Sequence, residues 1–173
     1  MNTKIAVLYG PVGGNTEKVA KLILEKLGAE KCDLIPVKDA KIETISNYNS
    51  FIIGGSTIGT HTWSHTNSSE DWDAFLPIFR KADFKGKKVA IFGLGDQLAY
   101  PNNFVDDMRI IYDIVIGKEA TVIGQVATDA YDYNDSVAIV DDKFIGLPLN
   151  EDHEEDLTNE RIEGWLASLK DQL

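Results

Sequence analysis

The chain has 173 residues, a length that predicts a single domain over residues 1–173. Its composition, 43% hydrophobic and 26% charged, argues against a disordered chain. Seventeen Lys and Arg residues against 28 Asp and Glu residues give a net charge of −11, which argues against nucleic-acid binding because that depends on neutralising phosphates. No apolar stretch reaches the ~20 residues that span a bilayer, so we expect no membrane segment. The single cysteine, Cys32, excludes an internal disulfide and fits a reducing, cytoplasmic setting.

The negative charge is concentrated in one part of the chain. Residues 1–124 hold 14 basic and 15 acidic residues, whereas residues 125–163 hold 2 basic and 12 acidic residues. Such a segment is either a solvated surface or an acidic face that attracts basic partner proteins at high association rates.

Apolar runs alternate with helical patterns along the chain. A continuous apolar run at residues 4–9 predicts a first strand. Val19, Ile23 and Leu27, spaced four residues apart, then predict an amphipathic helix that ends at Gly28. Further strands are predicted at residues 31–37, 50–55, 87–93 and 121–126, and further helices at 70–79, 104–116 and 159–169. This alternation predicts an α/β fold, a doubly wound five-stranded parallel sheet with helices on both faces.

Two segments depart from the regular alternation. Residues 56–69 are polar, lack periodicity and exceed an ordinary strand-to-helix loop, so we predict a functional loop there. Residues 127–149 predict an insertion that interrupts the fifth strand, with short extended segments at 137–140 and 144–149. Pro36 predicts that the second strand lies at an edge of the sheet.

Three loops at the carboxyl ends of the strands are the candidate ligand site, because doubly wound sheets bind ligands there. Residues 10–17 form a glycine-rich turn before a helix, which suits a phosphate; equally, this is a tight turn in which Asn15 or Thr16 caps the helix. The turn lacks the lysine of a triphosphate-binding P-loop and the spacing of a dinucleotide fingerprint. The other two loops contain Trp63 and Tyr100, which suit a flat aromatic ring.

Several segments of the chain follow one family pattern. They are residues 14–17, 71–73, 95–97 with Tyr100, 103–104, 128–136 and 156–162. Together these segments resemble flavodoxins of the long-chain type, and the resemblance covers essentially the whole chain, including the insertion. It implies an FMN-binding, low-potential one-electron carrier that shuttles electrons between redox proteins and is not an enzyme.

The resemblance also implies the residues of the site. The FMN phosphate is expected at Pro11, Val12, Gly13, Gly14, Asn15 and Thr16. The flavin ring is expected between Ser56, Thr57, Ile58, Gly59 and Trp63 on one side and Leu94, Gly95, Asp96, Tyr100, Asn103 and Phe104 on the other. Tyr100 would stack on the ring, Asp129 would lie near its ribityl or ring end, and nearby carboxylates would lower the potential. No metal site is expected.

Four positions depart from the family pattern. Pro11 and Gly13 stand where the family has hydroxyl side chains, although the backbone amides of residues 12–16 remain. Each lost hydrogen bond to the phosphate costs about 1.5–3 kcal/mol, so two weaken binding on the order of 10²–10⁴. Leu94 replaces a usual threonine, and Ile58 replaces a tryptophan that covers the ring. Trp63, or His61 beside it, is a candidate replacement for that cover; alternatively, Ile58 covers the ring weakly and Trp63 is a surface residue.

Three functions remain open from the sequence. The first is a monomeric FMN electron carrier that docks redox partner proteins on its acidic face. The second is a flavodoxin-fold binding or regulatory module whose altered loops weaken or change the flavin site. The third is an FMN-dependent reductase, which NAD(P)H oxidation would distinguish from the other two.

Overall fold

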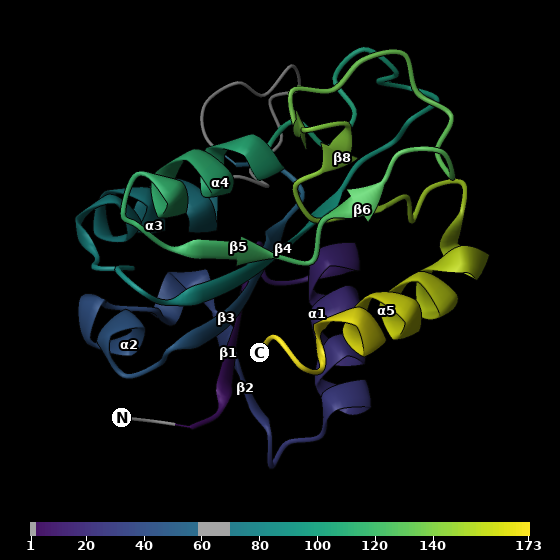
Figure 1. The fold of residues 1–173 in the computed structure, drawn as a ribbon. Helices are drawn as coiled ribbons and strands as arrows, with labels where there is room; N and C mark the ends of the chain where they lie inside the picture. The colour runs from purple at the N-terminus through teal and green to yellow at the C-terminus, as the bar shows by residue number, and fades with distance from the viewer. Residues whose placement is uncertain (1–2, 59–69) are drawn as a thin grey trace.

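The computed structural model describes residues 3–58 and 70–173. Its main sheet contains β1 (Ile5–Gly10), β2 (Cys32–Pro36), β3 (Ser50–Gly55), β4 (Lys88–Leu94), β5 (Thr121–Ile123) and β9 (Leu147–Leu149). The strands run parallel in the order β2-β1-β3-β4-β5, which confirms the predicted doubly wound sheet and the edge position of Pro36 (Figure 1).

The fifth position of the sheet is shared by two strands. Residues Lys88–Ala90 of β4 pair with β5, and Phe92–Leu94 pair with β9, both in parallel. The fifth strand, predicted at 121–126, ends at Ile123 and resumes at Leu147. The interruption is confirmed, but it covers residues 124–146 rather than 127–149, because Leu147–Leu149 pair with β4. Between them lies a small antiparallel sheet in the order β6-β8-β7, formed by β6 (Val126–Ala127), β7 (Ile139–Val140) and β8 (Lys143–Phe144).

Helices cover both faces of the main sheet (Figure 1). One face carries α1 (Gly14–Leu27) and α5 (Glu155–Leu169). The other carries α3 (Glu70–Lys81), α4 (Met108–Ile116) and two short helices that the sequence pattern did not predict, η1 (Val37–Asp39) and α2 (Ile42–Ser46). Within the described ranges, no helix has both the length and the apolar character needed to cross a membrane.

The two cores explain why the central strands are continuously apolar. Ala6 and Leu8 of β1 pack on the α3–α4 side, whereas Val7 and Tyr9 pack on the α1–α5 side. Successive side chains of a strand point to opposite faces, so a strand covered on both faces needs apolar residues at every position.

Two predicted helix boundaries shift for tertiary reasons. Helix α5 begins at Glu155, a full turn earlier than predicted. The buried Thr158 therefore lies inside the helix, where its hydroxyl donates a hydrogen bond to the Glu151 carboxylate. Helix α4 begins at Met108, later than predicted, because the preceding turn is tied to the insertion through the N–H of Phe104. Helical periodicity contains neither the contact of Thr158 with Glu151, seven residues before it, nor the long-range contact of Phe104 with Asp135.

The insertion packs against the turn between β4 and α4. The ring of Phe104 lies 5.8–5.9 Å from those of Tyr131, Tyr133 and Phe144, and the Ser136 hydroxyl donates to the Phe104 carbonyl at 2.6 Å. Burial raises the pKa of Tyr131 to about 12, so this phenol stays a donor to the carbonyl of residue 148 at 2.8 Å. The insertion therefore supports the loop in which Tyr100 lies.

Candidate functional site

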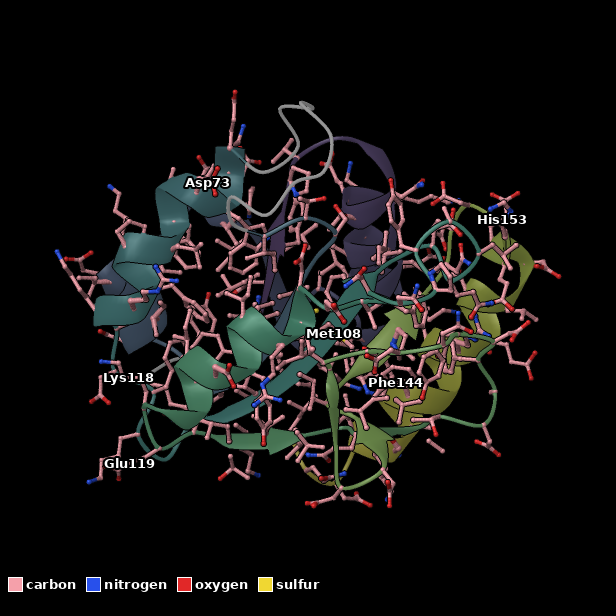
Figure 2. All side chains as sticks on the ribbon, turned by 90° about the horizontal axis from the view of Figure 1, so that it is seen from above. Asp73, Met108, Lys118, Glu119, Phe144 and His153 are labelled. Atoms are coloured by element: carbon pink, nitrogen blue, oxygen red, sulfur yellow. The ribbon has the colours of Figure 1, made fainter. Side chains whose placement is uncertain are left out.

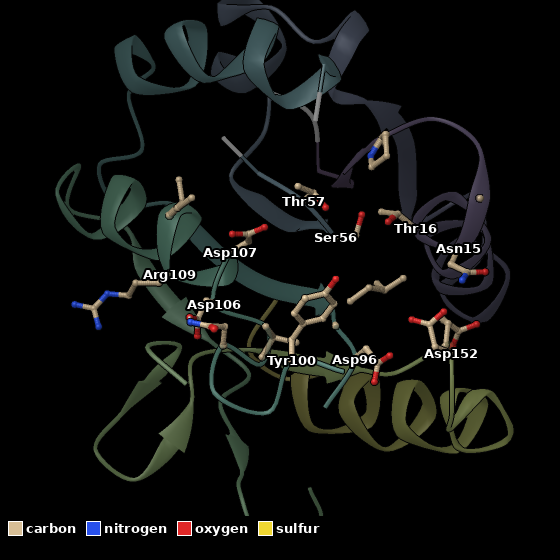
Figure 3. A pocket seen from close by; sticks show the side chains of 18 of the residues that line it. Asn15, Thr16, Ser56, Thr57, Asp96, Tyr100, Asp106, Asp107, Arg109 and Asp152 are labelled. Atoms are coloured by element: carbon tan, nitrogen blue, oxygen red, sulfur yellow. The ribbon is translucent and has the colours of Figure 1, made fainter. Parts of the chain in front are cut away.

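A cleft of about 810 Å³ opens at the carboxyl ends of β1, β3, β4 and β9 (Figure 3). Of the predicted residues, those lining it are Pro11, Gly13, Gly14, Asn15, Thr16, Ser56, Thr57, Leu94, Gly95, Asp96, Tyr100 and Asn103. The fold thus brings together the three loops singled out in the sequence. A cavity of this volume is in the range of sites that hold a small organic ligand.

The glycine-rich turn presents bare backbone to the cleft. Gly13 and Gly14 adopt φ angles of 85° and 74°, and a Cβ added at either would meet no atom within 4 Å among the described residues. Helix α1 begins at Gly14, and its N-cap residue is Gly13, which has no side chain. The alternative in which Asn15 or Thr16 caps the helix is therefore wrong. The open space and the helix N-terminus fit a phosphate group.

Two carboxylates hold this turn from outside the cleft. The N–H of Gly13 donates to Glu17 Oε2 at 2.7 Å, and the N–H of Val12 donates to Asp71 Oδ2 at 2.8 Å. The Gly13 hydrogen bond is the main reason that the pKa of Glu17 lies below its ordinary value. Of the amides expected to face an anion, those from Gly14 to Thr16 remain.

The loop after β4 is built around Asp96. Its Oδ1 accepts hydrogen bonds from the N–H groups of Leu98 and Ala99 at 2.9 and 3.0 Å, and its Oδ2 lies 3.2 Å from His153 Nε2. Burial alone would raise the pKa of Asp96, but these two N–H groups and His153 lower it overall. The resulting turn carries Tyr100, which is 54% exposed and is labelled at the centre of the cleft in Figure 3.

The loop after β3 is fixed by a contact that sequence reasoning missed. The N–H of Ile58 donates to Asp107 Oδ2 at 2.9 Å, and the Ile58 side chain is only 1% exposed within the core. Ser56 and Thr57 line the cleft, but Ile58 does not. Ile58 therefore packs in the core, and its contact with the flavin ring stays a prediction.

Three further predicted residues also lie outside the cleft lining. Val12 is 39% exposed and its amide turns to Asp71, whereas Phe104 is fully buried against the insertion. Asp129 is exposed on the insertion. Gly59, His61 and Trp63 lie outside the described residues.

The lining also includes residues that no local signal indicated. They are Val105, Asp106, Asp107, Arg109, Ile110, Asp113, Val137, Glu151 and Asp152. Most come from the start of α4 and the turn after β9, and only the fold brings these segments to the cleft. Sequence periodicity predicts a helix near 104–116 but not which of its residues face a ligand.

The rim of the cleft is strongly acidic. Its carboxylates are Asp96, Asp106, Asp107, Asp113 and Asp152, together with Glu151, which is buried and pairs with Lys18 at 3.2 Å. Arg109 is the one basic residue among the described lining residues; it pairs with Asp113 at 2.7 Å, and its guanidinium points away from the cleft in Figure 3. Lys118 is not among these lining residues: it follows the C-terminal end of α4, whereas Met108 begins the helix (Figure 2). Only Glu151 and Asp152 of these carboxylates come from the acidic segment 125–163, so the rim draws most of its charge from the first part of the chain.

This sheet and cleft define the chain as a doubly wound α/β protein with a mononucleotide-type site at the ends of its strands. A model of the flavodoxin family matches residues 7–165, and the chain belongs to that family. The flavodoxin of Nostoc sp. is 37% identical over 99% of this chain and 98% of its own length; one from Enterobacter agglomerans is 39% identical over 96% of each. The chain is an electron-transfer protein rather than an enzyme.

A solved structure gives the same result for the fold. The crystal structure of Fusobacterium nucleatum flavodoxin bound to flavin mononucleotide superimposes with a TM-score of 0.87 at 29% identity, covering 98% of each chain. The full coverage includes the insertion, which is compatible with the predicted long-chain type.

Proposed function

We propose that this flavodoxin binds FMN in the cleft and carries single electrons between redox proteins at low potential. The observation that carries the proposal is one cleft with the glycine-rich turn, open at Gly13 and Gly14, at one end and the exposed Tyr100 at the other. The flavin of FMN supplies one-electron redox chemistry when bound. The FMN-bound relative from Fusobacterium nucleatum supports the choice of cofactor.

The residues of the cleft divide into two roles. The amides from Gly14 to Thr16 and the Thr16 hydroxyl hold the phosphate, while Tyr100 stacks on the ring. Gly95, Asp96 and Asn103 meet the polar edge of the ring. The acidic rim disfavours added negative charge in the cleft, because like charges repel strongly where water is partly excluded, and this favours a low potential. Trp63 as the second ring cover and Asp129 near the ring end remain predictions.

A titration tests this proposal. Protein freed of flavin should quench FMN fluorescence with sub-micromolar affinity, and Tyr100→Ala should weaken binding by roughly tenfold to a hundredfold, since stacking on an aromatic side chain contributes about 1–3 kcal/mol. Leu98→Ala is the matched control, because Leu98 is 59% exposed in the same loop but does not line the cleft. Equal effects of both variants would contradict the stacking role, and no FMN binding by the unmodified protein would contradict the proposed function.

The acidic rim is the proposed docking face for redox partners. A partner with a basic face would be attracted toward the cleft, where the distance for electron transfer is short, and this is the arrangement that a small carrier needs. We propose that the protein acts as a monomer of one domain in the cytoplasm, since a carrier must leave one partner to reach the next.

Charge reversal at the rim is expected to slow electron transfer. Asp152→Lys should lower the second-order rate of reduction by a basic reductase several-fold at low salt, and 0.5 M NaCl should abolish the difference because exposed charges are screened. Glu30→Lys makes the same change of charge in the turn before β2, at the opposite end of the strands. If Glu30→Lys slowed reduction as much in stopped-flow traces, net charge and not the rim would be responsible.

A further inference from the structure

In the glycine-rich turn of residues 10–17, called the phosphate turn below, one of the backbone N–H groups that could bind an anion already donates to a carboxylate of the chain. Glu17 lies in the first turn of α1, and its carboxylate accepts the Gly13 N–H at 2.7 Å. The Tyr9 hydroxyl lies 3.3 Å from Glu17 Oε1, and Lys21 Nζ lies 3.2 Å from the same oxygen. Burial, followed by Glu17, raises the pKa of Tyr9, so the phenol remains a donor to this carboxylate. Three groups thus hold one carboxylate against the turn.

This arrangement affects an anion in two ways. First, an N–H that donates to Glu17 is not available to a phosphate, and a hydrogen bond to a charged group is a strong one. Second, the carboxylate places a negative charge beside the turn that would receive a phosphate dianion. Lys21 offsets that charge only in part, because its side chain is 63% exposed and its field is screened by water.

Glu17 is not needed to keep the turn in place. The Val12 N–H is anchored separately by Asp71 from α3, and Gly14 begins α1 directly after the turn. The indole N–H of Trp72 holds the Gly10 carbonyl at 3.1 Å on the other side. Removing the Glu17 carboxylate therefore leaves the turn attached at both ends.

We propose that Glu17 is a specificity-determining residue of this site, whose carboxylate competes with the phosphate of FMN for the Gly13 N–H. The inference rests on the proposed FMN function. Riboflavin lacks the phosphate of FMN. With Glu17 in place, the preference of the cleft for FMN over riboflavin is therefore smaller than it would be if the Gly13 N–H were free to bind the phosphate. The competing carboxylate weakens the phosphate contact and leaves the ring contacts unchanged.

The test compares two ligands in three variants. Flavin-free protein is titrated with FMN and with riboflavin, and the ratio of their dissociation constants isolates the contribution of the phosphate. Glu17→Ala frees the N–H and removes the charge, so the preference for FMN should rise about tenfold or more. Glu17→Gln keeps an acceptor but removes the charge, so the rise should be smaller, roughly threefold. Glu25→Ala, exposed on the same helix, should leave the ratio unchanged.

The outcomes separate this inference from the proposed function. If the unmodified protein binds neither flavin, the proposed function fails. If it binds both, and the ratio in Glu17→Ala is unchanged or lower, the competition is wrong and Glu17 only organises the turn. Riboflavin affinity shows whether each variant keeps its fold. Inorganic phosphate offers a readout without flavin: the Gly13 amide resonance should respond to it more strongly in Glu17→Ala than in the unmodified protein.

Discussion

Trp72→Ala is expected to lower the free energy of unfolding by about 3–5 kcal/mol and to weaken FMN binding as well. Trp72 is fully buried in α3, with ring centroids 5.7 Å from Phe75 and 6.0 Å from Phe79. Its indole N–H also donates to the carbonyl of Gly10 at 3.1 Å, directly before the phosphate turn. The substitution therefore leaves a large cavity and releases the start of that turn. Urea unfolding of the flavin-free protein measures the first effect, and FMN titration measures the second.

Two tryptophan-to-phenylalanine variants separate packing from the effect on the turn. Trp72→Phe and Trp165→Phe each remove a buried indole N–H that donates to a glycine carbonyl; the Trp165 bond to Gly124 measures 2.8 Å. Both should cost about 1–3 kcal/mol, because a buried carbonyl loses its partner. Only Trp72→Phe should weaken FMN binding, since neither Trp165 nor Gly124 lines the cleft. Equal FMN affinities in the two variants would show that the indole does not position the turn.

Gly146→Ala is expected to destabilise the protein by about 3 kcal/mol, at the upper end of the range for overpacking. Gly146 immediately precedes β9, and an added Cβ would overlap the backbone carbonyl of Ile91 in β4. Backbone in a central strand cannot move as a flexible side chain can, so β9 would have to separate from β4. Because Glu151 and Asp152 follow β9 and line the cleft, the thermal midpoint and FMN affinity should both fall.

A second glycine supplies the control for this substitution. Gly164 is exposed within α5, and a Cβ there would meet no atom within 4 Å among the described residues. Gly164→Ala should stabilise the protein by about 0.5–1 kcal/mol, because alanine is the better helix former. A thermal midpoint that rises in Gly164→Ala and does not fall in Gly146→Ala would contradict the proposed backbone contact.

Much of the architecture could be predicted because it depends on local sequence patterns. The continuous apolar runs at β1, β3 and β4 reflect strands buried on both faces, and the four-residue spacing in α1 reflects a helix with one buried face. The glycine-rich turn and Tyr100 were also predicted to follow strands, and both lie at the carboxyl ends of strands in the structure. These features depend on residues close to one another in the sequence, so a single chain reveals them.

The remaining details of the site depend on tertiary structure. Nothing local to Ile58 indicates that its amide meets Asp107 or that its side chain enters the core. Likewise, the carboxylates of Glu17 and Asp71 occupy two amides that the sequence assigned to the phosphate. Which donor meets which acceptor is decided when distant elements pack, because only packing brings the side chain of one element within hydrogen-bond distance of another element's backbone. The sequence by itself determined the sheet, the helices and the chemical class of the site, whereas packing decided which atoms of that site remain free to bind.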